Sequence, residues 1–228
     1  SQFLLKRILF ENELFLVINK PAGIAVHGGS GVRLGLIEAM RQLKPQWKEL
    51  ELAHRLDRDT SGCMIIAKDP IFLRQIHQQL KQKSVNKIYL ALVQGYWPDQ
   101  LIEVDAPLLK NYLRSGERVV RVDKSGKSSL TRFETVEHFG RGATLIKAMP
   151  VTGRTHQIRV HCQSTGHAIL GDPKYACPGQ PGSRPDIKKL CLHAASIEFE
   201  APHGGKMFKF EAPLDEFMEA QFKLLRSQ

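Results

Sequence analysis

The sequence predicts an α+β fold with a largely antiparallel or mixed β-sheet. Segments typical of strands outnumber those typical of helices and often follow one another directly, which favours α+β over an alternating α/β architecture. The chain has 228 residues, 42% of them hydrophobic and 25% charged, as expected for a globular protein with a sizeable core. No uninterrupted apolar stretch approaches the ~20 residues of a membrane helix, and the first residues are too mixed for a secretory signal. We therefore expect a soluble protein with no membrane partner.

The first third of the chain combines short apolar strands with amphipathic helices. An apolar run at residues 14–18 predicts a buried strand, and the Pro-Ala-Gly sequence after it predicts a turn at residues 20–23. The glycine-rich segment 27–31 lacks the Gly-Lys-Ser/Thr ending of a nucleotide-binding loop, so it is predicted as a turn. Asp69-Pro70 supplies the N-cap and first-turn proline of a helix. An earlier helix and a second strand are predicted at residues 34–43 and 64–67.

From Lys87 onward the pattern changes to a period of two, which is typical of strands. Ser115-Gly116 and Ser125-Gly126 are predicted as hairpin turns among these strands. The strands are predicted at residues 88–93, 119–122, 130–136, 145–149, 190–199 and 207–210.

Two helices complete the prediction. Residues 155–164 have helical spacing, and Gly166 suits the C-terminal cap of this helix. A final amphipathic helix is predicted to open at Ala212-Pro213. Consecutive strands in the middle of the chain, with helices before and after them, give the α+β class.

Basic residues exceed acidic ones by a wide margin. The chain has 33 lysines and arginines against 23 acids, a formal net charge of +10. Such an excess favours polyanionic partners, chiefly nucleic acid. Half of it comes from residues 110–132, which carry seven basic and two acidic side chains. Around hairpins this segment could line a phosphate backbone, although a solvated ribbon is the alternative.

The four cysteines, Cys63, Cys162, Cys177 and Cys191, form no CxxC pair. Scattered, mostly buried thiols are typical of a protein in a reducing cytosol, and a disulfide framework or zinc site is disfavoured. We therefore expect a cytoplasmic protein.

The densest local signal is the segment 54–62, His-Arg-Leu-Asp-Arg-Asp-Thr-Ser-Gly, on a predicted loop just before a strand. The alternative without a function is a solvent-exposed turn in which the arginines and aspartates pair with one another. Three features favour function: an arginine can hold a neighbouring carboxylate ionised, arginine reads phosphates well, and such sites favour loops on rigid strands.

A second signal lies at residues 153–161. On a helix, His156, Arg159 and Val160 would share one face. His156 and His161 are five residues apart and lack the glutamate of an HExxH site, so hydrogen-bonded or RNA-facing histidines are favoured over metal ligands.

These motifs together resemble the RluA-type family of RNA pseudouridine synthases, in order and spacing over essentially the whole chain. The matching segments are residues 20–23, 54–62, 87–89, 153–161, 171–172 and 192–194. The resemblance implies a curved, mostly antiparallel sheet with flanking helices. It also implies a reaction that breaks the N1–C1′ bond of a uridine in RNA, turns the base and rejoins it through C5, with no cofactor and no metal.

The resemblance also assigns roles to single residues. Asp57 matches the invariant catalytic aspartate, and Arg159 matches the arginine that pairs with it. Tyr89 matches the aromatic catalytic residue that stacks on the flipped uracil and could take a proton, and Arg55 matches the residue that fills the space left by the base. Because flipping a base costs a few kcal/mol, a stacked arginine can offset part of that cost. Residues expected to pack around the base are Ile158 and Leu192.

Segments 26–31, 106–111 and 115–122 resemble most closely the members that modify large-subunit ribosomal RNA. The alternatives are a family member acting on transfer RNA, a catalytically silent RNA-binding protein and a metal-dependent nuclease. Nothing in the chain resembles the N-terminal S4 RNA-binding domain of many relatives, so we expect residues 1–228 to be one isolated catalytic domain, and a monomer.

Overall fold

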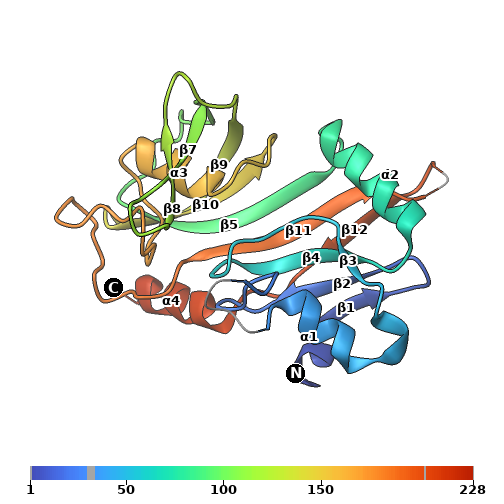
Figure 1. Cartoon of the computed structure of the whole chain (residues 1–228). Coiled ribbons are helices and arrows are strands. Elements are labelled where there is room, and N and C mark those ends of the chain that lie inside the picture. Colours follow the sequence, from blue (N-terminus) through green and yellow to red (C-terminus); the bar gives the residue numbers. More distant parts are fainter. Residues whose placement is uncertain (1, 30–33, 203, 228) are drawn as a thin grey trace. The chain divides into compact units, whose positions relative to one another are not determined.

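The computed structural model describes residues 2–29, 34–202 and 204–227 (Figure 1). The chain divides into two compact units, one made of Ser1–Lys87 and His193–Glu216 and the other of Ile88–Leu192 and Phe217–Gln228. Each unit is therefore built from two separate segments of the chain, and the segments alternate between the units along the sequence.

The first unit is a sheet with helices packed against it. Its strand order is β1-β2-β4-β11, with β3 also paired to β4 and β12 to β11. The β4–β11 pair is parallel, and the other pairs of this unit are antiparallel. Its strands are β1 (Ile8–Glu11), β2 (Phe15–Lys20), β3 (Glu51–Leu52), β4 (Ser61–Ala67), β11 (Leu192–Glu200) and β12 (Met207–Glu211). Its helices are the 3-10 helices η1 (Gln2–Arg7) and η2 (Pro45–Trp47) and the α-helices α1 (Leu36–Leu43) and α2 (Pro70–Lys81).

Strands β2 and β4 are buried on both faces. Every residue of β4 is buried, and so are five of the six residues of β2. A strand covered on both sides reads as a continuous apolar run, which is the pattern that predicted both strands.

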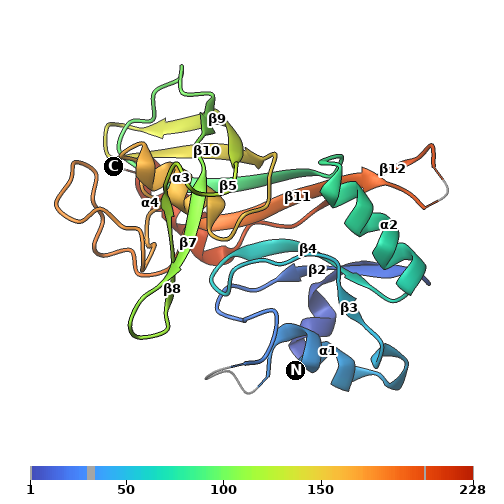
Figure 2. The ribbon, with the colours of Figure 1, turned by 45° about the horizontal axis from the view of Figure 1, so that its top comes forward.

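Helix α2 covers one face of this sheet. Asp69 accepts a hydrogen bond from the Phe72 backbone N–H at 2.7 Å, which confirms the predicted N-cap. The Phe72 ring then stacks on Phe15 of β2, with centroids 4.6 Å apart. Gln79 exchanges two hydrogen bonds of 3.0 Å with the backbone of Glu200, which ties the helix to the end of β11 (Figure 2).

The second unit contains an antiparallel sheet and a separate β-hairpin. The sheet has the order β5-β10-β9-β6, and β7 pairs only with β8 within the described residues. The strands are β5 (Asn86–Gln94), β6 (Glu103–Asp105), β7 (Leu108–Tyr112), β8 (Arg118–Val122), β9 (Leu130–Phe139) and β10 (Ala143–Pro150). The helices are α3 (Gln157–Ser164) and α4 (Glu216–Arg226).

The structure confirms the α+β class and the mostly antiparallel pairing. It corrects one turn: Ser125-Gly126 joins β8 to β9, which do not pair with each other, so it is no hairpin turn. Gly126 instead allows a close approach to β7, since a Cβ there would lie 2.4 Å from the Leu108 carbonyl carbon. The final helix begins at Glu216, later than the Ala212-Pro213 of the prediction.

The other predicted hairpin turn is confirmed. The Ser115-Gly116 turn does close the β7–β8 hairpin. All four cysteines are free thiols. Within the described ranges no helix is both long and apolar enough to cross a membrane. Part of the glycine-rich turn predicted at residues 27–31 lies outside the described residues.

Candidate active site

Asp57 lies on an irregular loop that connects β3 to β4 in the first unit. The Thr60 backbone N–H donates to the Asp57 carbonyl oxygen at 3.2 Å, which closes a turn. Asp57 is partly buried, whereas Arg55 and Arg58 are exposed. The Gly23 N–H donates to the Arg58 carbonyl at 2.9 Å, and Arg58 Nε donates back to the Gly23 carbonyl at 3.1 Å. The loop is therefore fixed to the turn that follows β2.

The buried Lys20 side chain also connects the Asp57 loop to the turn that follows β2. Its side chain is fully buried. Its ammonium donates to the carbonyl oxygens of Pro21, Ile24 and Arg58 at 2.9–3.0 Å. Burial lowers the pKa of Lys20 to about 7, against the opposing effect of the Asp59 and Asp57 charges. The resemblance included Lys20, but no sequence pattern indicated a buried charge beside Asp57.

The end of the loop is fixed by close contact between β4 and β11. Gly62 has φ +116°, and a Cβ there would lie 2.2 Å from the Ala194 carbonyl oxygen. Next to it, Ser61 Oγ lies 2.8 Å from Nδ1 of the buried His193, whose Nε2 lies 3.3 Å from the Ala212 carbonyl. Burial lowers the pKa of His193. A neutral ring that donates from Nε2 accepts the Ser61 hydroxyl at Nδ1.

His54, at the start of the loop, has a structural task. Its Nε2 accepts the Ile65 backbone N–H of β4 at 3.0 Å. Burial, together with Lys87 and His77, lowers the pKa of His54 to about 3. The ring is therefore a neutral acceptor at neutral pH and anchors the loop to the strand that follows it.

In the second unit, Arg159 makes a buried, bidentate ion pair with Asp172. Arg159 Nε and Nη2 donate to the two carboxylate oxygens at 2.8 and 2.9 Å. The side chain of Arg159 is 5% exposed and that of Asp172 0%. Asp172 also accepts the backbone N–H groups of Lys174 and Tyr175 at 2.9 and 3.1 Å. This geometry fixes the guanidinium plane, which a single ion pair would leave free to rotate.

Tyr175 joins this ion pair to the β7–β8 hairpin. The Arg159 guanidinium carbon lies 5.1 Å from the centre of the Tyr175 ring. The Tyr175 hydroxyl accepts the Val120 backbone N–H of β8 at 3.0 Å and lies 2.7 Å from His156 Nδ1. The same ring packs in a small buried cluster with Leu108, Val120 and Val160.

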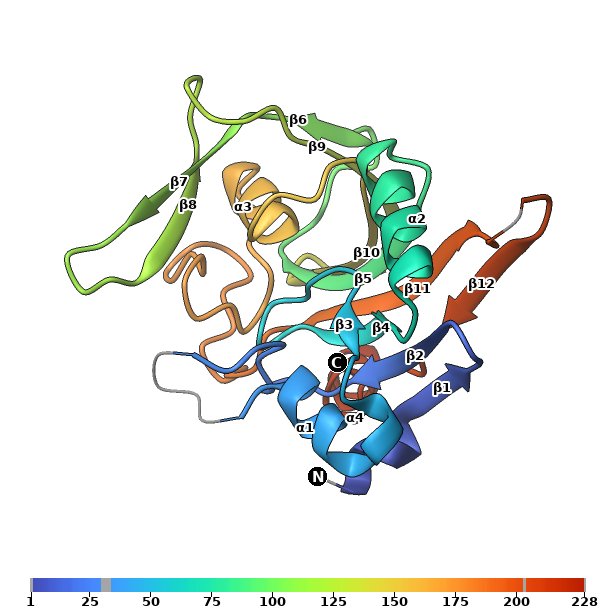
Figure 3. The same ribbon diagram turned by 45° about the vertical axis from the view of Figure 1, so that its right-hand side comes forward.

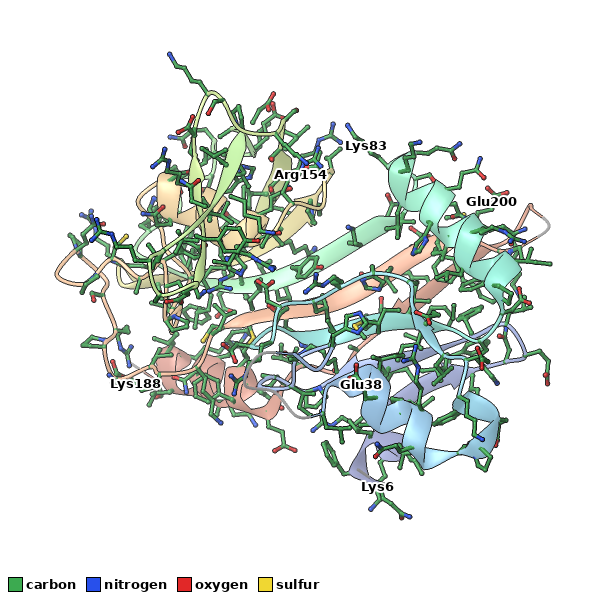
Figure 4. All side chains as sticks on the ribbon, in the orientation of Figure 1. Lys6, Glu38, Lys83, Arg154, Lys188 and Glu200 are labelled. Carbon is green, nitrogen blue, oxygen red and sulfur yellow. The ribbon has the colours of Figure 1, made fainter. Side chains whose placement is uncertain are left out.

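The N-terminus of α3 differs from the sequence expectation. His156 has φ +53°, in the left-handed region, and precedes the helix. It therefore does not share a helical face with Arg159 and Val160. The helix is anchored instead by Gln157, whose amide nitrogen donates to the Leu130 carbonyl at 2.9 Å and whose amide oxygen accepts the Arg154 backbone N–H at 3.0 Å (Arg154 is labelled in Figure 4).

The remaining predicted residues lie on strands and on α3. Tyr89 is on β5, partly buried, and pairs with Ala148 of β10. Ile158 of α3 and Leu192 at the start of β11 are both buried. Asp57 and Arg55 thus belong to the first unit, and the other four predicted site residues to the second. Over the described parts of the chain, no three His, Cys, Asp or Glu side chains gather as a metal site requires.

Comparison with known proteins identifies the family. A family model described as RNA pseudouridylate synthase matches residues 14–164, about two thirds of the chain. The chain belongs to this family. The match includes Asp57, Tyr89 and Arg159, and it confirms the family predicted from the sequence motifs.

Curated members of the family are similar over nearly the whole chain. Ribosomal large subunit pseudouridine synthase C of Pasteurella multocida is 53% identical over 98% of this chain and 69% of its own length. The proteins of the same name from Haemophilus influenzae and Escherichia coli are 52% and 48% identical, over 96% of this chain and 69% and 70% of their lengths.

Solved structures of the family share the fold. Human RNA Pseudouridylate Synthase Domain Containing 4 matches with a TM-score of 0.80 and 25% identity, over 99% of this chain and 95% of its own. Human RNA Pseudouridylate Synthase Domain Containing 1 gives a TM-score of 0.73 at 25% identity, over 97% and 94% of the two chains. The pseudouridine synthase fold class expected from the sequence is therefore confirmed.

Sequence reasoning alone missed three residues of this pseudouridine synthase. Lys20 and Asp172 stand in motifs that carry the resemblance, yet those motifs assign them no role. Tyr175 has no sequence signal beyond its position three residues after Asp172. Their importance comes from contacts between segments far apart in the chain.

Proposed function

We propose that this pseudouridine synthase modifies large-subunit ribosomal RNA, with Asp57 as its catalytic carboxylate. The assignment of this substrate is supported by the similarity to curated relatives that are 48–53% identical and are named for the ribosomal large subunit. Transfer RNA is the alternative substrate. We further propose that the protein works in the cytoplasm as a monomer, with residues 1–228 as one catalytic domain.

The reaction needs an anion that can attack the uridine or stabilise positive charge at C1′. Asp57 meets this need, because it is partly buried on a loop that is fixed at both ends. Lys20, which binds the same loop through the Arg58 carbonyl, also interacts electrostatically with Asp57. The old N1–C1′ bond breaks and the new C5–C1′ bond forms, while the hydrogen of C5 leaves to water as a proton and N1 takes up a proton from water. Substrate and product are therefore isomers, so the reaction needs no oxidant or reductant.

The other site residues act on the base. We assign Tyr89 to stacking on the flipped uracil, Arg55 to the space that the base leaves, and Ile158 and Leu192 to packing around the ring. Arg159, which family resemblance pairs with Asp57, is held in one orientation by Asp172. The exposure of Arg55 suits a side chain that must enter RNA.

The basic hairpin supports an RNA partner. Strands β7 and β8 and the turn after them carry most of the positive charge of residues 110–132, largely on exposed side chains. Cations arranged along a ribbon neutralise phosphates and make binding salt-dependent.

Tritium release from RNA labelled at uridine C5 tests the function. Large-subunit ribosomal RNA is incubated with the protein in the presence of EDTA, and tritium in water is measured. Wild-type protein should release tritium, whereas Asp57→Asn, which keeps the shape and removes the anion, should bind the RNA and release none. Appreciable release by Asp57→Asn would refute its role. Tritium release from transfer RNA alone would show that transfer RNA is the substrate. No release from either RNA would show that the protein binds RNA without modifying it.

A further inference from the structure

Tyr112 stands out on the β7–β8 hairpin because it is a large aromatic side chain left in solvent. Its exposed fraction is 62%, the highest among the tyrosines described. It pairs across the hairpin with Arg118, and Lys110, two residues earlier, lies on the same face of the ribbon. We propose that Tyr112, Lys110 and Arg118 form a binding site for one unpaired nucleotide of the RNA substrate.

The two cations lie close to the tyrosine hydroxyl. Lys110 Nζ is 5.4 Å from the centre of the Tyr112 ring. Hydrogen bonding and charge from Lys110, with a smaller effect of Arg118, lower the pKa of the Tyr112 hydroxyl. Two positive groups beside one exposed ring provide charge for a phosphate next to a surface on which a base can stack.

Arg118 adds an independent observation. Its Nε is buried and has no hydrogen-bond partner within the described residues, although the side chain as a whole is partly exposed. A guanidinium nitrogen withdrawn from water without an acceptor is costly. The negative charge of a phosphate beside the partly exposed guanidinium would offset part of that cost, although the buried Nε itself lies out of hydrogen-bonding reach of the RNA.

The base of the hairpin is rigid, whereas its tip projects from the rest of the second unit in Figure 3. Leu108 is buried at the base and Val120 at the middle of the hairpin, and the Val120 backbone N–H donates to the Tyr175 hydroxyl. Lys174 donates to the Arg118 carbonyl at 2.9 Å and pairs with Glu117 at 2.8 Å. A stacking residue on such a support is held in place before the ligand arrives, which limits the entropy lost on binding.

An unpaired nucleotide fits this site better than a duplex. A base inside a duplex is already stacked on its neighbours, whereas a base in a loop or bulge presents its face to an aromatic side chain. Stacking is also tolerant of sequence, so the site would add affinity without selecting the uridine that reacts. The identity of the ligand rests on the proposed function, because it assumes an RNA substrate.

Equilibrium binding of a short single-stranded RNA, compared with a duplex of the same sequence, tests the proposal. Tyr112→Ala should weaken single-strand binding roughly 5- to 100-fold, the effect of losing one stacked base, and change duplex binding little. Tyr112→Phe should bind nearly as wild type. Tyr96→Ala is the matched control, since Tyr96 is 49% exposed in the same unit but its ring already stacks on His138.

The charges are tested through salt dependence. Lys110→Gln and Arg118→Gln should each reduce the slope of log affinity against log salt by about 0.7 for a single strand. On irradiation, single-stranded RNA containing 4-thiouridine should form a crosslink to Tyr112. Equal single-strand affinity of Tyr112→Ala and wild type, or an equal loss for single strand and duplex, would overturn the site.

These outcomes are separate from those of the proposed function. If the wild type releases tritium and Tyr112→Ala binds single-stranded RNA as the wild type does, the proposed function stands and the nucleotide site is refuted. If no tritium is released but Tyr112→Ala weakens single-strand binding, the nucleotide site stands and the proposed function is refuted.

Discussion

Asp172 and Arg159 form an ion pair that is almost completely withdrawn from water. Removing two charges from water is costly, and the attraction between them offsets this only when further hydrogen bonds satisfy the remaining atoms. Here two backbone N–H groups complete the shell of Asp172. The pair therefore serves chiefly to fix the orientation of Arg159, and stability becomes sensitive to the loss of either partner.

We expect Asp172→Ala to lower the free energy of unfolding by about 3–5 kcal/mol, because it leaves a buried guanidinium without its counter-ion. Asp172→Asn should cost less, since its amide oxygen still accepts hydrogen bonds. Urea unfolding of the two variants and the wild type measures both effects. A cost below about 1 kcal/mol for Asp172→Ala would contradict the assigned role.

Gly62 makes a second prediction at this scale. In Gly62→Ala the new methyl group would meet the Ala194 backbone and the residue would keep φ +116°, so we expect a loss of more than about 2 kcal/mol in the free energy of unfolding. Gly116→Ala is the matched control, since Gly116 also has a positive φ, +81°, but its new methyl group would meet no heavy atom of a surrounding residue within 4 Å. It should lose only about 1–2 kcal/mol of backbone strain. Equal losses in urea unfolding would show that crowding at Ala194 is unimportant.

Among the elements, the β7–β8 hairpin and helix α3 meet at Tyr175. One hydroxyl bonds to the backbone of β8 and to His156 just before α3, while the ring lies beside Arg159. His156 keeps a left-handed conformation that is costly for a residue other than glycine. Such a conformation persists only where surrounding contacts hold it, and Tyr175 is one of those contacts.

Tyr175→Phe should loosen this junction while keeping the apolar packing of the ring. The Val120 N–H loses its acceptor, which we expect to cost about 1–3 kcal/mol in stability. Hydrogen exchange measured by mass spectrometry should show faster exchange in the peptide containing Val120. In the tritium assay kcat and KM should stay close to those of the wild type, because Asp172 and the aromatic ring at position 175 still hold Arg159. Unchanged exchange at Val120 would be evidence against the junction.

For the protein as a whole, Lys20 links stability to pH. Burial lowers its pKa from 10.5 to about 7 in the folded state. Between these values the unfolded chain binds the extra proton, so stability should rise with pH from about 7 towards 10, by at most about 1.4 kcal/mol per pH unit for one proton. Below pH 7 both states are protonated, and the contribution is constant.

Lys20→Met should remove this pH dependence. Urea unfolding of both proteins at several pH values from 7 to 10 gives the free energy of unfolding of the wild type minus that of the variant, in which other titrating groups cancel. That difference should grow with pH. Parallel profiles would mean that Lys20 keeps its proton throughout this range in the folded protein.

The fold class, the family and most of the elements were predictable from the amino-acid sequence. Helix α2 was predictable because its signals are local: Asp69 caps it and Pro70 begins it. Strands β2 and β4 were predictable because burial on both faces leaves an uninterrupted apolar run. Asp57 stood out because it lies in a dense motif, and the RNA partner followed from charge.

The residues that support these motifs became evident only from the folded structure. Strands β6 and β7 escaped prediction because their short, half-exposed sequences have weak patterns and acquire partners only in the sheet and hairpin. His156 left the helix, the final helix began at Glu216, and Ser125-Gly126 became a connection between β8 and β9. Lys20, Asp172 and Tyr175 owe their roles to bonds with Arg58, Arg159 and Val120. Propensity and periodicity act between near neighbours in the chain, whereas these bonds join segments that only folding brings together.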